Sequence, residues 1–436
     1  MRKRFFRLAL INILSTLTVP LVGLVDTAML GHLPDIRFLA GVALAALLFD
    51  FLYWTLGFLR MGTTGMTAQA VGRGDREEVA LVLYRSASIA LVLGAVIVLL
   101  QLPLREIGFG LLSGEPGVEL AGRDYFNARI WGAPAVLGSF VLMGWFLGRE
   151  ESRHVLVMAV VGNLGNVLFN YVFIIRMQLA ASGAGLASAV SQYLMLAVGC
   201  GIYFRRRERT PWSWSTVLDR TRLATMFRLN RDILLRTLCL VTSFALFVNS
   251  SSILGTLWLA SNSILLRLQA LASFLIDGAA MASESLAGIF RGQDDVHALR
   301  RLFRLSLTTG LGISVVFLAI LYGGKRLVLG LLTSHADVIA ASTDFMPWLV
   351  PVLLFGSLAY MYDGLFLGLT EGRSLRNAML VSTFLIFVPS CWVALQLDSN
   401  HGLWASMALF MVARTLTLWV ASRTVLRSAS REAGVA

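Results

Sequence analysis

Twelve apolar stretches, each long enough to cross a lipid bilayer, constrain this chain more than any other feature. About 20 apolar residues in a helix span the ~30 Å hydrocarbon core of a bilayer. Backbone N–H and C=O groups find no water there, so each spanning stretch must be a helix. The sequence therefore predicts an all-α polytopic membrane protein, with spans at about residues 8–31, 40–62, 86–104, 125–148, 154–175, 183–204, 233–257, 259–283, 303–322, 343–369, 375–396 and 401–422.

The composition is typical of a protein whose mass lies in the bilayer. The chain is 57% hydrophobic and 14% charged, whereas soluble domains carry about 25% charged residues. The net charge of +12 does not indicate nucleic-acid binding, because the basic residues lie in loops between apolar stretches. We expect the lipid bilayer to surround the protein and no nucleic acid to be a partner.

Lys and Arg residues are divided unequally between the two sides of the membrane. Most of the 37 lie at the chain ends and in the loops on the same side as those ends. By the positive-inside rule, both termini are predicted to be cytoplasmic. The opposite loops hold few basic residues, namely Arg37, Arg105, Arg123, Arg129, Arg176, Lys325 and Arg326.

The first half of the sequence is partly repeated in the second half. Gly144-Trp-Phe-Leu-Gly148 recurs 220 positions later as Gly364-Leu-Phe-Leu-Gly368, and Gly74 within an Arg-Gly-Asp segment has a loose counterpart at Gly292, 218 positions later. We interpret this as a tandem duplication, with an N-lobe at 1–204, a cytoplasmic linker at 205–228 and a C-lobe at 229–436. Six spans in each half make the repeats parallel, and substrate sites of such proteins lie between repeats near the bilayer midplane.

Asp26 is the only charged residue between Leu8 and Gly31. A carboxylate at that depth is costly and normally faces the protein interior or a water-filled cavity. It is either a functional group or a structural carboxylate bonded to neighbouring amides. Because ionisable residues within spans are functional candidates by default, Asp26 is the first candidate site residue.

The fifth and sixth spans contribute uncharged polar groups. Asn163, Asn166 and Asn170 follow one another in steps of three and four, which places them on one face of a helix. Ser188 and Gln192 follow in the next span. Such side chains either join helices by hydrogen bonds or line a cavity, and both readings are open for Asn163.

The second half has two acids within its predicted spans, Asp277 and Asp363. They are candidates for a substrate cavity, or they pair structurally with Arg267 or Arg414. Near the start of the seventh span, the spacing of Asp232 and Arg236 predicts a local ion pair across one helical turn.

Aromatic residues and one further acid complete the candidates. Tyr53 and Tyr360 suit contact with flat organic cations, and they equally suit packing. Asp50 lies within the second span without an evident partner.

Motifs for catalysis or for nucleotide binding are missing from the sequence. It has no phosphate-binding loop, no His-Glu-x-x-His and no Gly-x-Ser-x-Gly, and its five His residues are scattered. We therefore expect neither an enzyme nor a bound cofactor or metal.

Several blocks resemble the multidrug and toxic compound extrusion (MATE) family, specifically its DinF branch. They are Val19-Pro-Leu-Val-Gly-Leu-Val-Asp26-Thr-Ala28 with Gly31-His-Leu33, Phe58-Leu-Arg-Met-Gly-Thr-Thr-Gly65, Asn230-Arg-Asp232, Asp277-Gly278 and Asp363-Gly-x-Phe366-x-Gly368. The resemblance implies twelve helices in two six-helix lobes around a central cleft. It also implies a monomer in the bacterial plasma membrane that exports small organic compounds in exchange for cations.

The same resemblance implies a cation-coupling site in the N-lobe. The family's acid falls on Asp26, its Asn on Asn166 and its hydroxyl on Ser188, whereas its second acid falls on Asn170, where this sequence departs from the pattern. One carboxylate instead of two favours protons as the coupling ion, with sodium as the alternative. A lipid-linked precursor flippase is the other alternative, and it would need several cavity arginines; a passive channel and a membrane enzyme are less favoured.

Overall fold

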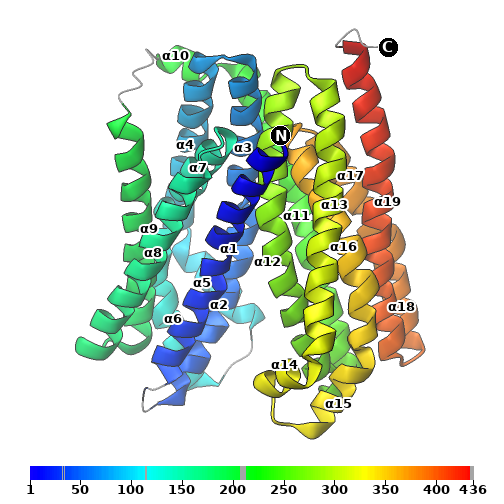
Figure 1. Cartoon of the computed structure of the whole chain (residues 1–436). Helices are drawn as coiled ribbons and strands as arrows, with labels where there is room; N and C mark the ends of the chain where they lie inside the picture. Colours follow the sequence, from blue (N-terminus) through cyan, green and yellow to red (C-terminus); the bar gives the residue numbers. More distant parts are fainter. Residues whose placement is uncertain (32, 34, 113–114, 207–212, 433–436) are drawn as a thin grey trace. The chain divides into compact units, whose positions relative to one another are not determined.

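The protein is built almost wholly from helices (Figure 1). This computed structural model describes residues 1–31, 33, 35–112, 115–206 and 213–432; the side chains of residues 19–22, 24, 214, 429, 431 and 432 also lie outside the description. Within the described ranges there is no β-strand. The predicted all-α fold class is confirmed.

Among the residues that the structure describes, eleven helical segments are long and apolar enough to cross a membrane. A further helix, α1 (Arg2–Gly31), has 30 residues and is about 45 Å long at 1.5 Å per residue. Together they account for the twelve predicted spans. The eleven are Ile36–Arg73, Arg76–Leu99, Pro116–Gly148, Ser152–Arg176, Ala180–Arg205, Arg220–Leu254, Thr256–Gly292, Val296–Gly323, Ala336–Gly368, Gly372–Gln396 and Asn400–Ser428.

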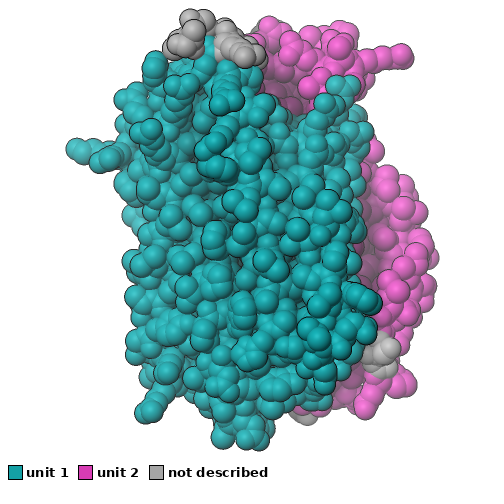
Figure 2. All heavy atoms as spheres, turned by 90° about the vertical axis from the view of Figure 1, so that its right-hand side faces the viewer, with its two compact units in different colours: residues 1–13, 227–436 teal, residues 14–226 magenta. Residues whose placement is uncertain are grey.

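The chain divides into two compact units, which Figure 2 distinguishes by colour. One unit comprises residues 14–226. Besides most of α1, it contains α2 (Ile36–Leu56), α3 (Phe58–Arg73), α4 (Arg76–Leu99), α5 (Gln101–Leu111), α6 (Pro116–Arg129), η1 (Ile130–Gly132), α7 (Ala133–Gly148), α8 (Ser152–Asn170), η2 (Tyr171–Arg176), α9 (Ala180–Arg205) and α10 (Trp214–Val217).

The other unit comprises residues 1–13 and 227–436, and within it the start of α1 and the end of α19 lie at the same end (Figure 1). It contains most of α11 (Arg220–Leu254) together with α12 (Thr256–Gly292), α13 (Val296–Gly323), α14 (Lys325–Leu332), α15 (Ala336–Phe345), η3 (Met346–Trp348), α16 (Leu349–Gly368), α17 (Gly372–Leu380), η4 (Val381–Phe387), α18 (Val388–Gln396) and α19 (Asn400–Glu432).

The unit boundaries differ from the lobes drawn from sequence at two places. The first 13 residues, assigned to the first lobe, group with residues 227–436. Part of the predicted linker is helical, because α11 already begins at Arg220. The short helix α10 is held by Arg85 of α4, whose guanidinium donates to the carbonyls of Thr216 at 3.0 Å and Val217 at 3.3 Å.

The tandem duplication is visible in matching close helix contacts within each unit. A Cβ atom on Gly144 or Gly148 of α7 would overlap backbone carbonyls of Arg60 and Thr64 on α3. The same holds for their counterparts in α16, where a Cβ atom on Gly364 or Gly368 would overlap the carbonyl of Ala280 or Glu284 on α12. Each of these glycines and carbonyls lies 220 positions after its counterpart in the first repeat. Small residues let helix backbones approach this closely, so the repeated glycines preserve one packing contact.

Hydrogen bonds repeat at the same offset. Thr63 donates to Ser86 at 2.8 Å, and Ser283 donates to Ser306 at 2.8 Å. Asp75 and Asp295 cap α4 and α13, each accepting from a backbone N–H three residues later. The structural offset is therefore 220 here also, instead of the 218 that the glycine match suggested.

Candidate functional site

Asp26 lies on α1 in direct contact with α8. The side-chain nitrogen of Asn170 (Nδ2) donates to the carboxylate of Asp26 at 2.5 Å and to the side-chain oxygen of Asn166 at 3.0 Å. Asn170 is 1% exposed and Asn166 is 6% exposed, whereas Asp26 is half-buried. One acid and two amides thus form a chain of hydrogen bonds inside the unit of residues 14–226.

The backbone changes its helical form next to this cluster. Asn170 is the last residue of α8, and the π-helical segment η2 begins at Tyr171. Such wider turns occur often at functional sites. The side-chain oxygen of Asn170 (Oδ1) is buried without a hydrogen-bond partner among the described residues. It is therefore a hydrogen-bond acceptor that lies beside the acid.

The other polar residues expected in this region are placed differently. Asn163 donates to the hydroxyl of Thr18 at 2.7 Å, so it joins α8 to α1 as the interhelical bond that was one of its two readings. Ser188 and Gln192 are half-buried on α9. Within the described residues, neither side chain is hydrogen-bonded to Asp26, and the roles of both stay predictions.

A cation that the sequence placed in a loop lies in an aromatic cluster of the same unit. The guanidinium carbon of Arg129, at the end of α6, lies 4.6 Å from the ring centre of Phe49, 5.5 Å from that of Tyr125 and 5.8 Å from that of Tyr53. Arg129 also donates to the hydroxyl of Tyr125 at 2.6 Å. Tyr53 is therefore part of an arginine-binding cluster.

Arg129 also acts electrostatically on Asp26 and Asp50, the two acids that lie within the predicted spans of this unit. Its charge lies within range of the carboxylates of Asp26 and Asp50. Asp50, for which the sequence offered no partner, has a nearby cation. Two spacings of four, Phe49 with Tyr53 and Tyr125 with Arg129, are the sequence signal that would have indicated the cluster.

In the unit of residues 1–13 and 227–436, three charged residues from three different helices form a buried ion cluster. Asp363 of α16 accepts from Arg236 of α11 and, at 2.7 Å, from Arg414 of α19. Arg414 is 0% exposed, Asp363 4% and Arg236 5%. The guanidinium of Arg414 further lies 5.3 Å from the ring centre of Tyr360. Of the two readings for Asp363, structural pairing with Arg414 is present.

The local pair predicted between Asp232 and Arg236 is wrong. Arg236 turns to Asp363, while Asp232 pairs with Arg376 of α17 at 2.8 Å. Tertiary contacts override the one-turn spacing, because both partners lie on other helices. Asp277 is half-buried and lies within electrostatic range of Arg236 and Tyr360. The predicted cavity residues Asp277 and Tyr360 therefore belong to the same charged region as Asp363.

Possible metal ligands are dispersed in the described part of the chain. No group of three or more His, Cys, Asp or Glu side chains there is placed to hold a metal ion. The three cysteines are free thiols.

A duplicated bundle of spanning helices with charged, hydrogen-bonded groups inside its spans is the architecture of a secondary membrane transporter. The chain belongs to the MatE family, which matches residues 12–172 and again residues 233–393. The two matches correspond to the two repeats.

Known relatives agree with this assignment. DNA damage-inducible protein F of Escherichia coli is 32% identical over 422 residues, covering 95% of this chain and 91% of that protein. A probable multidrug resistance protein NorM of Shewanella oneidensis is 24% identical over 441 residues, covering 97% and 95%. The DinF-branch resemblance is confirmed.

A solved structure shows the same fold. A transporter of the MOP superfamily from Pyrococcus furiosus superposes with a TM-score of 0.87, covering 98% of this chain and 96% of that chain at 19% identity. The protein is thus a multi-pass membrane protein of a transporter family, and its relatives are not enzymes.

Proposed function

We propose that the protein exports amphipathic organic cations across the bacterial plasma membrane in exchange for protons. Asp26 is the coupling acid, and both termini are cytoplasmic. The hydrogen bond from Asn170 to Asp26, at 2.5 Å, is the observation that supports this most directly. It places the only acid of α1 in contact with a second helix at a point where a charge is costly.

The exchange follows from the two protonation states of one carboxyl group. When the site faces the periplasm, Asp26 takes up a proton and releases the bound cation. When it faces the cytoplasm, Asp26 loses the proton and the negative charge binds the next cation. A ligand shifts a two-state equilibrium only through its different affinity for the two states, so proton and cation must compete for this group.

The amides have a positioning role in this proposal. Asn170 donates one hydrogen bond to Asp26 and one to Asn166, which orients its amide group. Donation to a carboxylate favours the charged form of that carboxylate. Arg129 acts in the same direction, because its positive charge lies within range of Asp26.

Charge balance limits the driving force. One proton entering for one monovalent cation leaving moves no net charge, so only the pH gradient drives that exchange. A transmembrane voltage, worth about 2.3 kcal/mol per charge at 100 mV, contributes only if a second proton is carried. Asp363 is held by two arginines, which leaves Asp277 and Asp50 as candidates for such a step.

Sodium is the alternative coupling ion, and one observation bears on it. The unpartnered carbonyl oxygen of Asn170 is a potential ligand. However, the side-chain nitrogen of Asn170 lies between the oxygens of Asp26 and Asn166, whereas a hard cation such as sodium needs several oxygen atoms directed at one point. This arrangement suits a proton better than a sodium ion.

The flippase alternative would require arginines free to bind a pyrophosphate. Arg236 and Arg414 are buried, yet both are bound to Asp363, and Arg129 is stacked among aromatic rings. These contacts favour the exporter over the flippase.

Transport by purified protein in liposomes tests the proposal. Ethidium and tetraphenylphosphonium serve as probe cations, with an imposed pH gradient and with or without sodium. We expect accumulation against a concentration gradient that depends on the pH gradient and is unchanged when sodium is omitted. Transport that strictly requires sodium contradicts proton coupling, and flux that only follows the probe's own gradient indicates a passive channel.

A further inference from the structure

An apolar groove on the unit of residues 1–13 and 227–436 has no role in the proposed exchange. Its volume is about 650 Å³, and it lies between the start of α1, α12 and α13. Its walls are almost entirely apolar, with Phe6, Leu275, Ile313, Val316, Phe317 and Ile320 among them. Val316 and Ile320 are 58% and 67% exposed, so the groove opens outward from the unit.

The groove extends along α13. Its lining residues on that helix run from Leu305 to Ile320, which is about 22 Å at 1.5 Å per residue. One leaflet contributes about half of the ~30 Å hydrocarbon core. The groove is therefore long enough for an extended acyl chain that enters from one membrane surface.

Positive charge is concentrated at one end of this groove. Arg2 lines it directly, and Arg301 and Arg304 precede Leu305 and Thr308 by one turn on α13, which places them on the same helical face. All three are exposed. Within the described residues, no acidic side chain forms an ion pair with any of them. This end is the one that the basic loops predict to be cytoplasmic.

The base of the groove is held in place by tight packing of α1. Phe5 and Leu8 are 0% and 1% exposed, and the backbone of Ile13 lies so close to Gly278 of α12 that a Cβ atom on that glycine would overlap it. Arg2 and Phe6 are consequently fixed as one wall. Gly312 on the opposite wall has no atom within 4 Å of the position that a Cβ atom would take, as expected for a residue facing an open groove.

We propose that this groove is a binding site for an anionic phospholipid of the cytoplasmic leaflet. One acyl chain lies between α1, α12 and α13, and the phosphate group binds Arg2, Arg301 and Arg304. Anionic lipids are attracted to clustered basic residues at the cytoplasmic surface by about 1 kcal/mol per Lys or Arg. A cationic transport substrate does not fit, because three uncompensated positive charges repel it.

The test compares lipid binding by purified, delipidated protein. Phosphatidylglycerol and phosphatidylcholine with identical acyl chains are titrated, and bound lipid is counted by native mass spectrometry. We expect wild type to prefer phosphatidylglycerol. The Arg301→Gln/Arg304→Gln variant should bind it about thirtyfold more weakly, which is two such contributions at tenfold per 1.4 kcal/mol.

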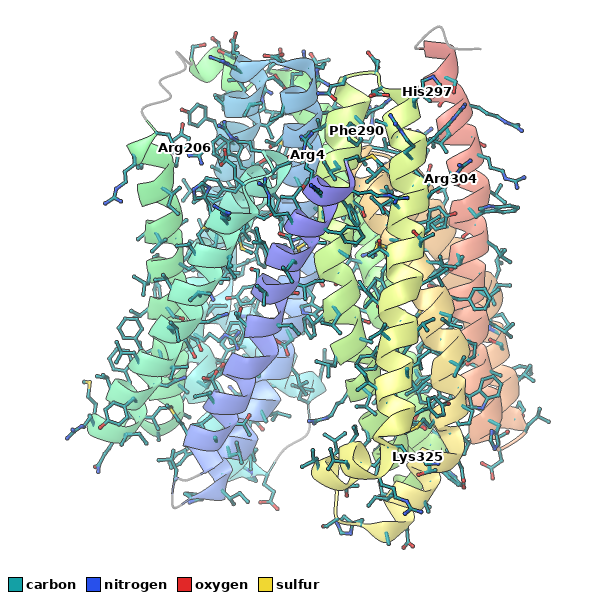
Figure 3. The ribbon with its side chains drawn as sticks, in the orientation of Figure 1. Arg4, Arg206, Phe290, His297, Arg304 and Lys325 are labelled. Carbon is teal, nitrogen blue, oxygen red and sulfur yellow. The ribbon has the colours of Figure 1, made fainter. Side chains whose placement is uncertain are left out.

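Matched controls separate this site from general charge effects. Lys325→Gln/Arg326→Gln removes two basic residues from the other end of the α13 region, as the positions of Arg304 and Lys325 in Figure 3 show. That variant should bind phosphatidylglycerol as wild type does. All four side chains are at least partly accessible to solvent, so neither double variant disturbs the core.

A second variant tests acyl-chain binding in the apolar part of the groove independently. Gly312→Trp fills the groove and should reduce binding of both lipids at least tenfold, whereas Gly201→Trp, at a position of α9 that is also open around the Cβ atom, should reduce neither. Equal phosphatidylglycerol binding by wild type and both groove variants overturns the proposal. Displacement of bound lipid by tetraphenylphosphonium in wild type also overturns it, because the groove would then be a substrate site.

Discussion

Replacing Asp363 with Asn is predicted to destabilise the protein strongly. Asp363 is the carboxylate shared by Arg236 and Arg414, and all three residues are at most 5% exposed. The variant leaves two buried guanidinium groups without their common counter-ion. Removing one partner of a buried ion pair costs about 3–5 kcal/mol, because the remaining charge is left uncompensated.

The size of the effect can be expressed as a melting temperature. For a unit of 150–250 residues, 1 kcal/mol corresponds to about 2–4 °C, so Asp363→Asn should lower Tm by roughly 6–20 °C. Thermal unfolding of the purified protein, followed by size-exclusion chromatography after heating, measures this. Asp344→Asn, an exposed acid on α15, is the control and should change stability by no more than about 0.5 kcal/mol.

A double variant shows whether the loss arises from unpaired charge. Asp363→Asn/Arg236→Gln removes one of the two stranded cations and should be more stable than Asp363→Asn alone, since only Arg414 is left uncompensated. The reasoning is refuted if Asp363→Asn melts with wild type yet abolishes exchange. That result would make Asp363 a coupling acid instead of a structural one.

Three further substitutions test other parts of the account. Gly144→Ala places a methyl group against the Arg60 carbonyl and should cost about 1–3 kcal/mol in a thermal unfolding assay, whereas Gly110→Ala, which meets nothing within 4 Å, should not destabilise. Arg129→Gln should move the half-maximal point of pH-driven exchange toward higher pH, because the nearby acids lose a positive charge that favours their charged forms; an unchanged pH profile argues against a role in coupling. Asn170→Asp supplies a second acid beside the first, and exchange of a monovalent cation should then respond to an imposed voltage; insensitivity to voltage would show that no second proton is carried.

Much of the architecture could be predicted from the sequence, because bilayer physics leaves few options. An apolar stretch of about 20 residues must be a helix, so the twelve spans follow from composition alone. The repeat could be inferred from two glycines of α7 and their counterparts in α16. Its full extent became visible only in paired contacts such as Thr63 with Ser86 and Ser283 with Ser306, since hydroxyl pairs leave no distinctive sequence pattern.

The charged groups were harder to predict, because their partners are distant in the chain. Asp26 and Asn170 are 144 positions apart. Residue spacing cannot assign them to one site, whereas the family resemblance does. The one-turn spacing predicts Asp232 as the partner of Arg236, whereas its actual partner, Asp363, lies 127 positions away. The sequence places Arg129 in a loop, whereas its aromatic partners lie on α2 and α6.

The central claim is that Asp26 exchanges a proton for the transported cation. Proton release on binding tests it most directly: tetraphenylphosphonium is added to purified protein in weakly buffered detergent solution, and the released protons are counted with a pH-sensitive dye. We predict about one proton per bound cation from wild type and none from Asp26→Asn. Equal release from the two proteins would contradict the claim.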